Sequence, residues 1–563
     1  MHRKNLSPTP VPPAVPPWIQ GVAWCVLAVL WLGSLGARAL ISPDEGRYAT
    51  LALGMLQSGD WLTPRLNGFL YFEKPILPYW MGALSLQLFG LNEFGARFWP
   101  GFTGLMTVVA VAWTARRLWD ELAGHCAGLV AAGSTWIIAN SHFLSLDMGL
   151  TFFLTLALCA FLVAQRDGVP PTEQRYAMWL CWAAMAGATL SKGLIGLVIP
   201  GAALVLYSLV QRQFGFWRRM HWGTGLLLFF ALTAPWFVAV SLENPGFFDF
   251  FFVREHFRRF LTDEARRTGT VTYFLPYLLV GLLPWTTLLP GMFRRGLQGE
   301  RGAVFQPLRL LGIWSLFILV FFSVSRSKLP SYILPMFPAL ALVAGRLLSL
   351  LRPAQFQWHL LLPMLLWLAI LVAAPFVDRW VGPDVPREAL QSFTRVLAWA
   401  AALFLLAAVL AWYLLRRERL LAALALVALG SVLAVTVALV GHDRYGGQLK
   451  SSKAVVPQLA PYLQADTEVF SVRYYDQTLP FYLRRPVTLV DYRDEFSFGQ
   501  DAEPTRWLPT LDAFVARWQR LPRAAAMMSQ GTYQELLQQD LPMRIAYQDP
   551  YRLVVVKPEG LAP

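Results

Sequence analysis

Long apolar segments set the strongest limit on what this chain can fold into. A helix of about 20 apolar residues crosses the ~30 Å hydrocarbon core of a bilayer, where every backbone polar group must be hydrogen bonded inside the protein. With 56% of its 563 residues hydrophobic and only 15% charged, the chain is too apolar for an ordinary soluble domain. The sequence therefore predicts a polytopic, all-α membrane protein with about thirteen transmembrane helices, at approximately 18–40, 95–118, 122–140, 148–165, 176–191, 193–210, 222–242, 271–293, 307–325, 331–350, 358–377, 393–415 and 419–440.

The first apolar segment follows a short basic and proline-rich stretch, 1–17. The tripeptide at 37–39, Ala-Arg-Ala, resembles a signal-peptidase site, so a cleavable signal peptide is the alternative interpretation. The apolar run is longer than the roughly 7–15 residues of a signal peptide's hydrophobic region. We therefore expect the segment to remain as the first transmembrane helix.

One further apolar stretch, 76–89, is too short for a span and rich in Trp, Tyr and Pro. If it is not counted as a span, the positive-inside rule places most loop arginines in the cytoplasm with Arg3 and Lys4. These arginines are Arg116, Arg117, Arg166, Arg175, Arg212, Arg218, Arg219, Arg294, Arg295, Arg301, Arg346, Arg352, Arg416, Arg417 and Arg419. We therefore expect 76–89 and 44–58 to be two interfacial helices in an outer loop, 41–94, with Tyr71, Tyr79 and Trp80 anchored at the level of the lipid headgroups.

The composition changes after His442 to polar sequence punctuated by proline. Short β-rich runs alternate there with amphipathic helical patterns. The runs lie at 468–472, 487–490 and 552–556, and the helical patterns at 511–520 and 533–539. This region contains no glycine-rich phosphate loop and no metal motif, and we expect a small α/β domain that supports or gates access of the acceptor.

Two aspartates, Asp44 and Asp147, lie at predicted span boundaries on the outer face. The simple interpretation is that each one caps a helix. The functional alternative is favoured because both carboxylates share that face with Lys74 and Lys192. Charged groups at the edge of the hydrocarbon cost free energy, so a group of them there indicates a functional site.

Cations also gather on the outer face, against the positive-inside rule. A lone lysine such as Lys74 can simply extend to a lipid headgroup. A cluster of arginines and lysines instead favours a phosphate-bearing ligand, because arginine binds phosphate through two parallel hydrogen bonds and lysine acts as a point charge. The cluster consists of Lys74, Lys192, Arg254, Arg258, Arg259, Arg266, Arg267, Arg326 and Lys328.

Six motifs in this order resemble a known family. They are PDEGRYA (43–49), SGDWLTP (58–64), YFEKPILPYW (71–80), SLDM (145–148), SKG (191–193) and SKLPSYILP (327–335). Each motif alone is weak, but the set resembles the bacterial lipid A aminoarabinose transferases, which belong to the GT-C glycosyltransferases together with the protein O-mannosyltransferases. The resemblance covers about the first 340 residues, and the remaining third is similar only in architecture.

The resemblance implies a transmembrane catalytic domain, 1–440, with outer loops 41–94 and 243–270, followed by a periplasmic α/β domain, 441–563. It implies transfer of 4-amino-4-deoxy-L-arabinose from undecaprenyl phosphate to lipid A phosphate at the periplasmic face of the bacterial inner membrane. Such a change lowers the negative charge of lipopolysaccharide and gives resistance to polymyxin and other cationic peptides.

Residue roles follow from the same family analogy. Asp44 is expected to be the principal catalytic carboxylate, with Asp147 as a second acidic residue and Lys74 as a third catalytic group. The carrier phosphate is expected to contact Lys74, Arg259, Lys192 and Tyr332, and the donor pocket to be lined by Arg47, Tyr48, Tyr71 and Glu73. No cofactor is expected for the chemistry, but Glu73 and His256 are candidate ligands of a structural zinc ion, which prefers four ligands.

The chemistry of the acceptor bears on the role of Asp44. A phosphate monoester has a second pKa near ~6 and is already mostly dianionic at neutral pH, so it hardly needs a general base. We therefore expect Asp44 to position the donor and to balance charge at an oxocarbenium-like centre or at the sugar's ammonium. Lys74 and the arginines are expected to stabilise the departing lipid phosphate.

Two other classes of protein remain open from the sequence. A related GT-C enzyme would use another sugar, or a protein or different lipid acceptor. A transporter would place its charges near the middle of the bilayer, in paired broken helices, and no such repeat is present. We expect a monomer in the membrane that binds no nucleic acid.

Overall fold

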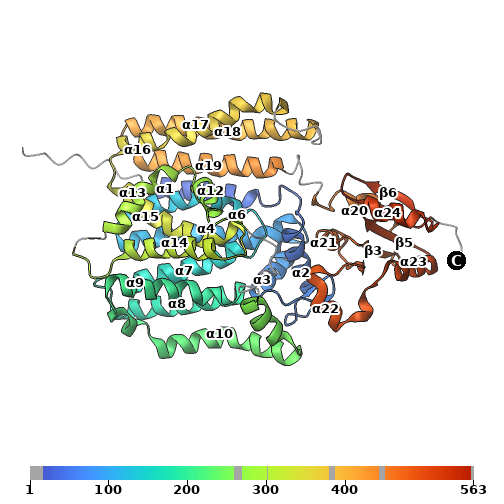
Figure 1. Ribbon diagram of the computed structural model, residues 1–563. Coiled ribbons are helices and arrows are strands. Elements are labelled where there is room, and N and C mark those ends of the chain that lie inside the picture. The colour runs from blue at the N-terminus through green and yellow to red at the C-terminus, as the bar shows by residue number, and fades with distance from the viewer. Residues whose placement is uncertain are drawn as a thin grey trace, which may run out of the picture.

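A long helical bundle carries a small sheet-containing domain at one of its ends (Figure 1). The structure is a computed structural model that describes residues 17–258, 269–298, 300, 302–379, 387–442 and 450–558. The bundle consists of α1 (Pro17–Gly33), α4 (Glu93–Leu118), α5 (Glu121–Gly133), α6 (Thr135–Ser141), α7 (Asp147–Gln165), α8 (Pro171–Lys192), α9 (Ile195–Gln211), α10 (Trp222–Glu243), α12 (Phe274–Gly281), α13 (Leu289–Gln298), α14 (Pro307–Val324), α15 (Phe337–Leu350), α16 (Pro353–His359), α17 (Leu361–Ala373), α18 (Arg387–Arg416) and α19 (Leu420–His442).

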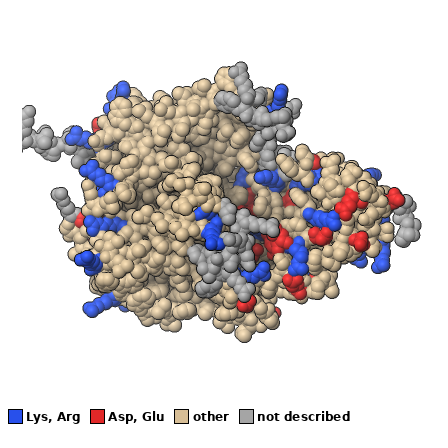
Figure 2. Space-filling view, in the orientation of Figure 1, with Lys and Arg blue, Asp and Glu red and all other residues tan. Residues whose placement is uncertain are grey.

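Eight helices in the described part of the chain are long and apolar enough to cross a membrane, or up to ten if two bent pairs each count as one span. Ten of the roughly thirteen predicted spans correspond to these eight helices and two bent pairs. The other predicted spans correspond to the shorter helices α1 and α9 and to α8, which carries Glu173, Arg175 and Lys192. The visible flank of the bundle is nearly free of charged side chains, as a lipid-facing surface requires (Figure 2).

The two bent pairs are an unpredicted feature, with an angle of 60° between α5 and α6 and 107° between α12 and the segment Thr286–Gln298. The backbone groups freed at these breaks bind one another, because Thr135 N donates to Leu283 O over 3.0 Å. Ser431 Oγ on α19 donates to Gly133 O over 2.7 Å. The breaks are therefore tolerated inside the bundle because neighbouring elements satisfy the polar groups that they expose.

The first outer loop lies between the bundle and the C-terminal domain (Figure 1). It contains the two predicted short helices, α2 (Asp44–Ser58) and α3 (Leu77–Phe89), joined by a hairpin of β1 (Arg65–Leu66) and β2 (Phe69–Leu70). Tyr71 and Tyr79 are 2% and 1% exposed, so the expectation that they anchor the loop at the lipid headgroups was wrong. They belong to a hydrophobic core that the loop shares with the C-terminal domain.

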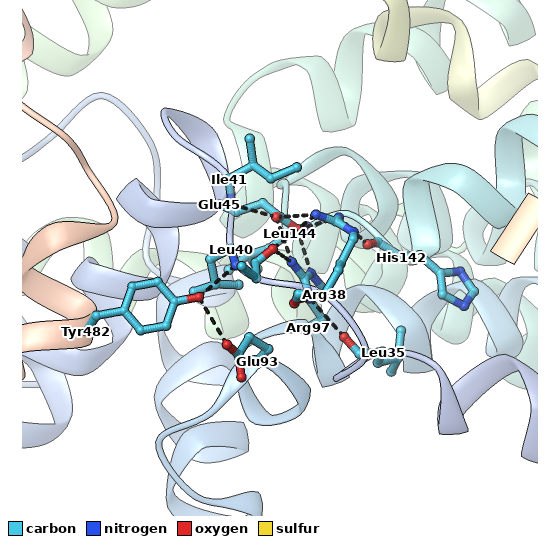
Figure 3. A network of polar contacts seen from close by, with 11 residues as sticks. Leu35, Arg38, Leu40, Ile41, Glu45, Glu93, Arg97, His142, Leu144 and Tyr482 are labelled. Atoms are coloured by element: carbon cyan, nitrogen blue, oxygen red, sulfur yellow. Dashed lines mark hydrogen bonds and ion pairs between the residues drawn. The ribbon is translucent and has the colours of Figure 1, made fainter. Parts of the chain in front are cut away.

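A buried charge network fixes the start of α2 (Figure 3). Glu45 pairs with Arg38 at 2.9 Å and with Arg97 of α4 at 2.7 Å, and it accepts a hydrogen bond from Leu144 N. Burial alone would raise the pKa of Glu45, but the two guanidinium groups outweigh it and lower the pKa to about 2. The network joins the end of α1, α2, α4 and the segment before α7 at one point.

The C-terminal domain is built on a five-stranded sheet with the strand order β4-β3-β5-β7-β6. Its strands are β3 (Glu468–Val472), β4 (Thr488–Val490), β5 (Ala524–Met528), β6 (Arg544–Gln548) and β7 (Leu553–Val556), and its longer helices are α23 (Leu511–Arg520) and α24 (Gln530–Leu537). Side chains alternate between the two faces, so Ala526 and Val555 belong to a core with α23, while Met527 and Val554 belong to the core that also contains residues of the first outer loop. The loop therefore completes the core of this domain.

Candidate functional site

A cavity of about 1090 Å³ opens where the bundle, the first outer loop and the C-terminal domain meet. One part of its wall is charged and another is apolar. The charged and tyrosine side chains are Asp44, Arg47, Tyr48, Glu73, Lys74, Asp147, Lys192, Arg254, Tyr332, Asp494 and Glu495, and the apolar wall includes Trp136, Leu150, Ile195, Ile199, Phe321, Phe322 and Leu439. This combination suits a ligand with an anionic group and a hydrocarbon chain.

Asp147 begins α7, and both of its carboxylate oxygens have partners. Lys192, the last residue of α8, forms an ion pair with Oδ1, and Ser331 Oγ donates to Oδ2 over 2.6 Å. Lys192 Nζ also lies 4.7 Å from the centre of the Tyr332 ring, a cation–π contact. Three distant segments that the sequence placed on one face therefore meet at this carboxylate.

Asp44 lies in the first turn of α2 and is more accessible than Asp147. Arg47 Nη1 contacts Asp44 Oδ1 at 3.0 Å, and Arg47 Nη2 pairs with Glu495 of the C-terminal domain. The side chain of Asp44 is 32% exposed, against 11% for Asp147 and 5% for Glu495. Asp44 is therefore held on one side and open to the cavity on the other.

Tyr48, Glu73 and Lys74 complete the wall on the side of the first outer loop. Lys74 Nζ donates to Glu73 O over 2.7 Å. Burial and the nearby carboxylate of Asp44 raise the pKa of Tyr48 above its ordinary value. Tyr48 therefore keeps its proton and offers a hydroxyl donor to a ligand in the cavity.

Among the predicted site residues that the structure describes, Tyr71 does not line the cavity. Tyr71 was expected in the donor pocket, but it lies buried behind the wall, where its close neighbours include Arg47. Arg259 and the side chain of His256 lie outside the described residues. Within residues 17–258 and the other described ranges, no group of three or more His, Cys, Asp or Glu side chains is placed to hold a metal ion. The zinc site at Glu73 and His256 stays a prediction.

The structure adds cavity residues that the sequence did not indicate. Asp494 and Glu495 come from the C-terminal domain, and no motif in the sequence links that domain to Asp44. Ser331 lies inside the SKLPSYILP motif, so its position was signalled although its role was not. Lys328 of the same motif donates to Ser323 O and Ser325 O over 2.6 and 2.7 Å, and so it caps the end of α14 instead of entering the cavity.

Comparisons with known proteins cover both parts of the chain. Residues 24–251 match the family model described as dolichyl-phosphate-mannose-protein mannosyltransferase. Residues 455–557 match the one described as aminoarabinose transferase C-terminal domain. The helical part that carries Asp44 and Asp147 and the sheet domain that carries Glu495 are thus each similar to a transferase family.

A relative in Pseudomonas aeruginosa (strain UCBPP-PA14) decides the family. It is named undecaprenyl phosphate-alpha-4-amino-4-deoxy-L-arabinose arabinosyl transferase and is 34% identical over 393 residues, which are 67% of this chain and 70% of the relative. This chain belongs to that family. The family's ArnT from Cupriavidus metallidurans, in a crystal structure bound to undecaprenyl phosphate, superposes with a TM-score of 0.91 at 37% identity, over 97% of this chain and 99% of that one. The expected fold, a polytopic helical bundle of GT-C type followed by a small α/β domain, is confirmed by this match.

Other family members align over a shorter part. The protein of the same name from Aeromonas salmonicida (strain A449) is 36% identical over 331 residues, which are 58% of this chain and 59% of the relative. The chain thus spans about three fifths of the length of the first curated relatives that it matches.

Proposed function

We propose that this protein is a glycosyltransferase that moves 4-amino-4-deoxy-L-arabinose from undecaprenyl phosphate to a phosphate group of lipid A. The observation that carries the proposal is the cavity, where a partly exposed carboxylate, Asp44, faces the same space as Lys74 and the Asp147–Lys192 pair. Support comes from the names of the relatives and from the carrier lipid bound in the Cupriavidus protein.

The cations of the cavity act on the carrier phosphate. Lys74 and Lys192 stabilise the negative charge that grows on this phosphate as its bond to the sugar breaks. Both carboxylate oxygens of Asp147 are already bound by Lys192 and Ser331. The role of Asp147 is therefore to neutralise and orient Lys192. The apolar wall near Ile195 and Phe321 receives the first part of the polyprenyl chain.

Asp44 acts on the sugar. The incoming lipid A phosphate is already mostly dianionic at neutral pH and needs no general base. Asp44 therefore positions the donor and balances positive charge at the reacting carbon or at the sugar's ammonium. Arg47 Nη1, 3.0 Å from Asp44 Oδ1, fixes the orientation of the Asp44 carboxylate. The cavity faces the periplasm in this scheme, because the loop arginines then fall in the cytoplasm.

A reconstituted transfer reaction tests the proposal. Purified protein, undecaprenyl-phosphoryl aminoarabinose and lipid A are incubated together, and lipid A is examined by mass spectrometry. The expected product is lipid A heavier by one aminoarabinose unit, together with free undecaprenyl phosphate. Release of the carrier with lipid A unchanged would indicate a different acceptor, and no release from this donor would exclude the proposed activity.

A further inference from the structure

The C-terminal domain touches the first turns of α2 at Gln477. A Cβ atom on Gly46 would lie 2.5 Å from the carbonyl carbon of Gln477, so the two backbones are in direct contact. Thr50 Oγ1 donates to Gln477 O over 3.1 Å. The backbone of Gln477 is therefore fixed against the helix that carries Asp44.

The side chain of Gln477 completes a ring of contacts around Asp44. Its Oε1 accepts a 2.5 Å hydrogen bond from Ser42 Oγ, and its Nε2 donates to Glu495 Oε1 over 3.2 Å. The other oxygen of Glu495 pairs with Arg47, which contacts Asp44. The ring thus begins two residues before Asp44 in the chain and ends on the Asp44 carboxylate.

We propose that Gln477 is a positioning residue, which holds Ser42 and Glu495 so that Arg47 presents Asp44 to the cavity. This inference rests on the proposed function, because it assigns Asp44 to the reacting sugar. It also makes the C-terminal domain a working part of the catalytic site and not only a support or gate at the outer surface.

The chemistry of the ring suits an amide at this position. An amide both accepts and donates, whereas a carboxylate has no donor for Glu495 and an ammonium has no acceptor for Ser42. Gln477 is only 6% exposed, so an unmatched polar group there would cost free energy. Burial raises the pKa of Glu495 and the nearby Glu73 carboxylate adds to the rise, while the Arg47 charge and the Gln477 amide oppose it.

Gln477→Met tests the proposal because methionine has a similar length and shape without hydrogen-bonding groups. We expect kcat to fall by about 10- to 100-fold, the effect of a small displacement of a catalytic group. The KM for the donor should stay within about 2-fold of the wild type, because Lys74 and Lys192 lie outside the ring. The matched control is Glu503→Gln, which removes the 3.0 Å ion pair with Arg65 between the same two parts of the molecule and should leave kcat unchanged.

Hydrogen exchange of the peptide 41–48 supplies a readout that needs no substrate. We expect its amides to exchange about 10-fold faster in Gln477→Met, and not in Glu503→Gln. A wild-type protein that fails to transfer aminoarabinose would refute the proposed function, while the exchange data would still report on the ring. Wild-type exchange and kcat in Gln477→Met, or equal losses in both variants, would overturn the positioning role.

Discussion

The two aspartates of the cavity differ in their surroundings, and this difference assigns their roles. Asp147 has a partner on each oxygen, so its charge is used to hold Lys192 and Ser331. Asp44 is held by Arg47 on one side and is 32% exposed. Of these two aspartates, Asp44 is therefore the one that we propose to face the sugar.

Replacement of Asp44 by asparagine tests a positioning role against a role as general base. We expect kcat of Asp44→Asn to fall by about 10²- to 10³-fold, as for loss of one electrostatic contact in a transition state. The loss should persist from about pH 7 to pH 9, since the acceptor phosphate, with a second pKa near ~6, is already mostly deprotonated there. The measurement is kcat against pH, and recovery of activity above pH 8 would instead indicate proton abstraction.

Asp147→Asn should destabilise the protein because it leaves the Lys192 charge in the cavity wall without its counter-ion. Loss of one partner of a buried pair typically costs about 3–5 kcal/mol. The double variant Asp147→Asn/Lys192→Met should regain most of the stability but not the transfer activity. Thermal unfolding in detergent and the lipid A assay measure the two quantities, and a fully stable single variant would argue against the pairing.

At the scale of elements, α2 is fixed at its first turn by Glu45, Arg38 and Arg97 (Figure 3). The folded-state pKa of Glu45 is about 2, below its ordinary value of 4.5. Between about pH 2 and pH 4.5, the unfolded chain therefore binds more protons at Glu45 than the folded protein does. The stabilisation from Glu45 is complete above pH 4.5 and is lost as the pH falls toward 2.

The difference in unfolding temperature between the wild type and Glu45→Gln measures this contribution. We expect the wild type to be the more stable at pH 7 and the advantage to shrink as the pH is lowered from 5 to 3. Circular dichroism melts in detergent provide the measurement. An advantage that is independent of pH over this range would contradict the low pKa.

Hydropathy and periodicity predicted elements well where each element has its own signal. The runs at 468–472 and 552–556 correspond to β3 and β7, and the pattern at 511–520 to α23. β5 was missed because its sequence, AAAMM, has no β-branched or aromatic residue. The bends at Ser134 and near Pro284 were missed because distant backbone groups stabilise them.

In the site, too, only residues that lie in a local sequence motif could be predicted. Motif order was enough to indicate Asp44, Asp147, Lys74 and Lys192, which do line one cavity. The contacts of Glu495 and Gln477 were not predictable, because they join residues more than 400 positions apart and leave no local pattern. Contacts of this kind depend on tertiary packing alone.

In the whole molecule, the proposed function requires α2 to lie on the outer side of the membrane and the arginine-rich loops on the inner side. Cys25 is the exposed one of the four cysteines, so a Cys25→Ser background is suitable for labelling. In intact spheroplasts, a membrane-impermeant thiol reagent should label Ser58→Cys, at the end of α2, and should not label Arg212→Cys until the cells are opened. Labelling of both positions from the same side would contradict the topology.

In the proposed reaction, the carrier phosphate and the reacting sugar meet in the cavity between the bundle and the C-terminal domain. The most direct measurement is an experimental structure of this protein with undecaprenyl phosphate bound. We predict phosphate density in the cavity, within hydrogen-bonding distance of Lys74 or Lys192 and on the side that Asp44 faces. Phosphate density outside the cavity, for example among the arginines at the opposite end of the bundle, would contradict the account.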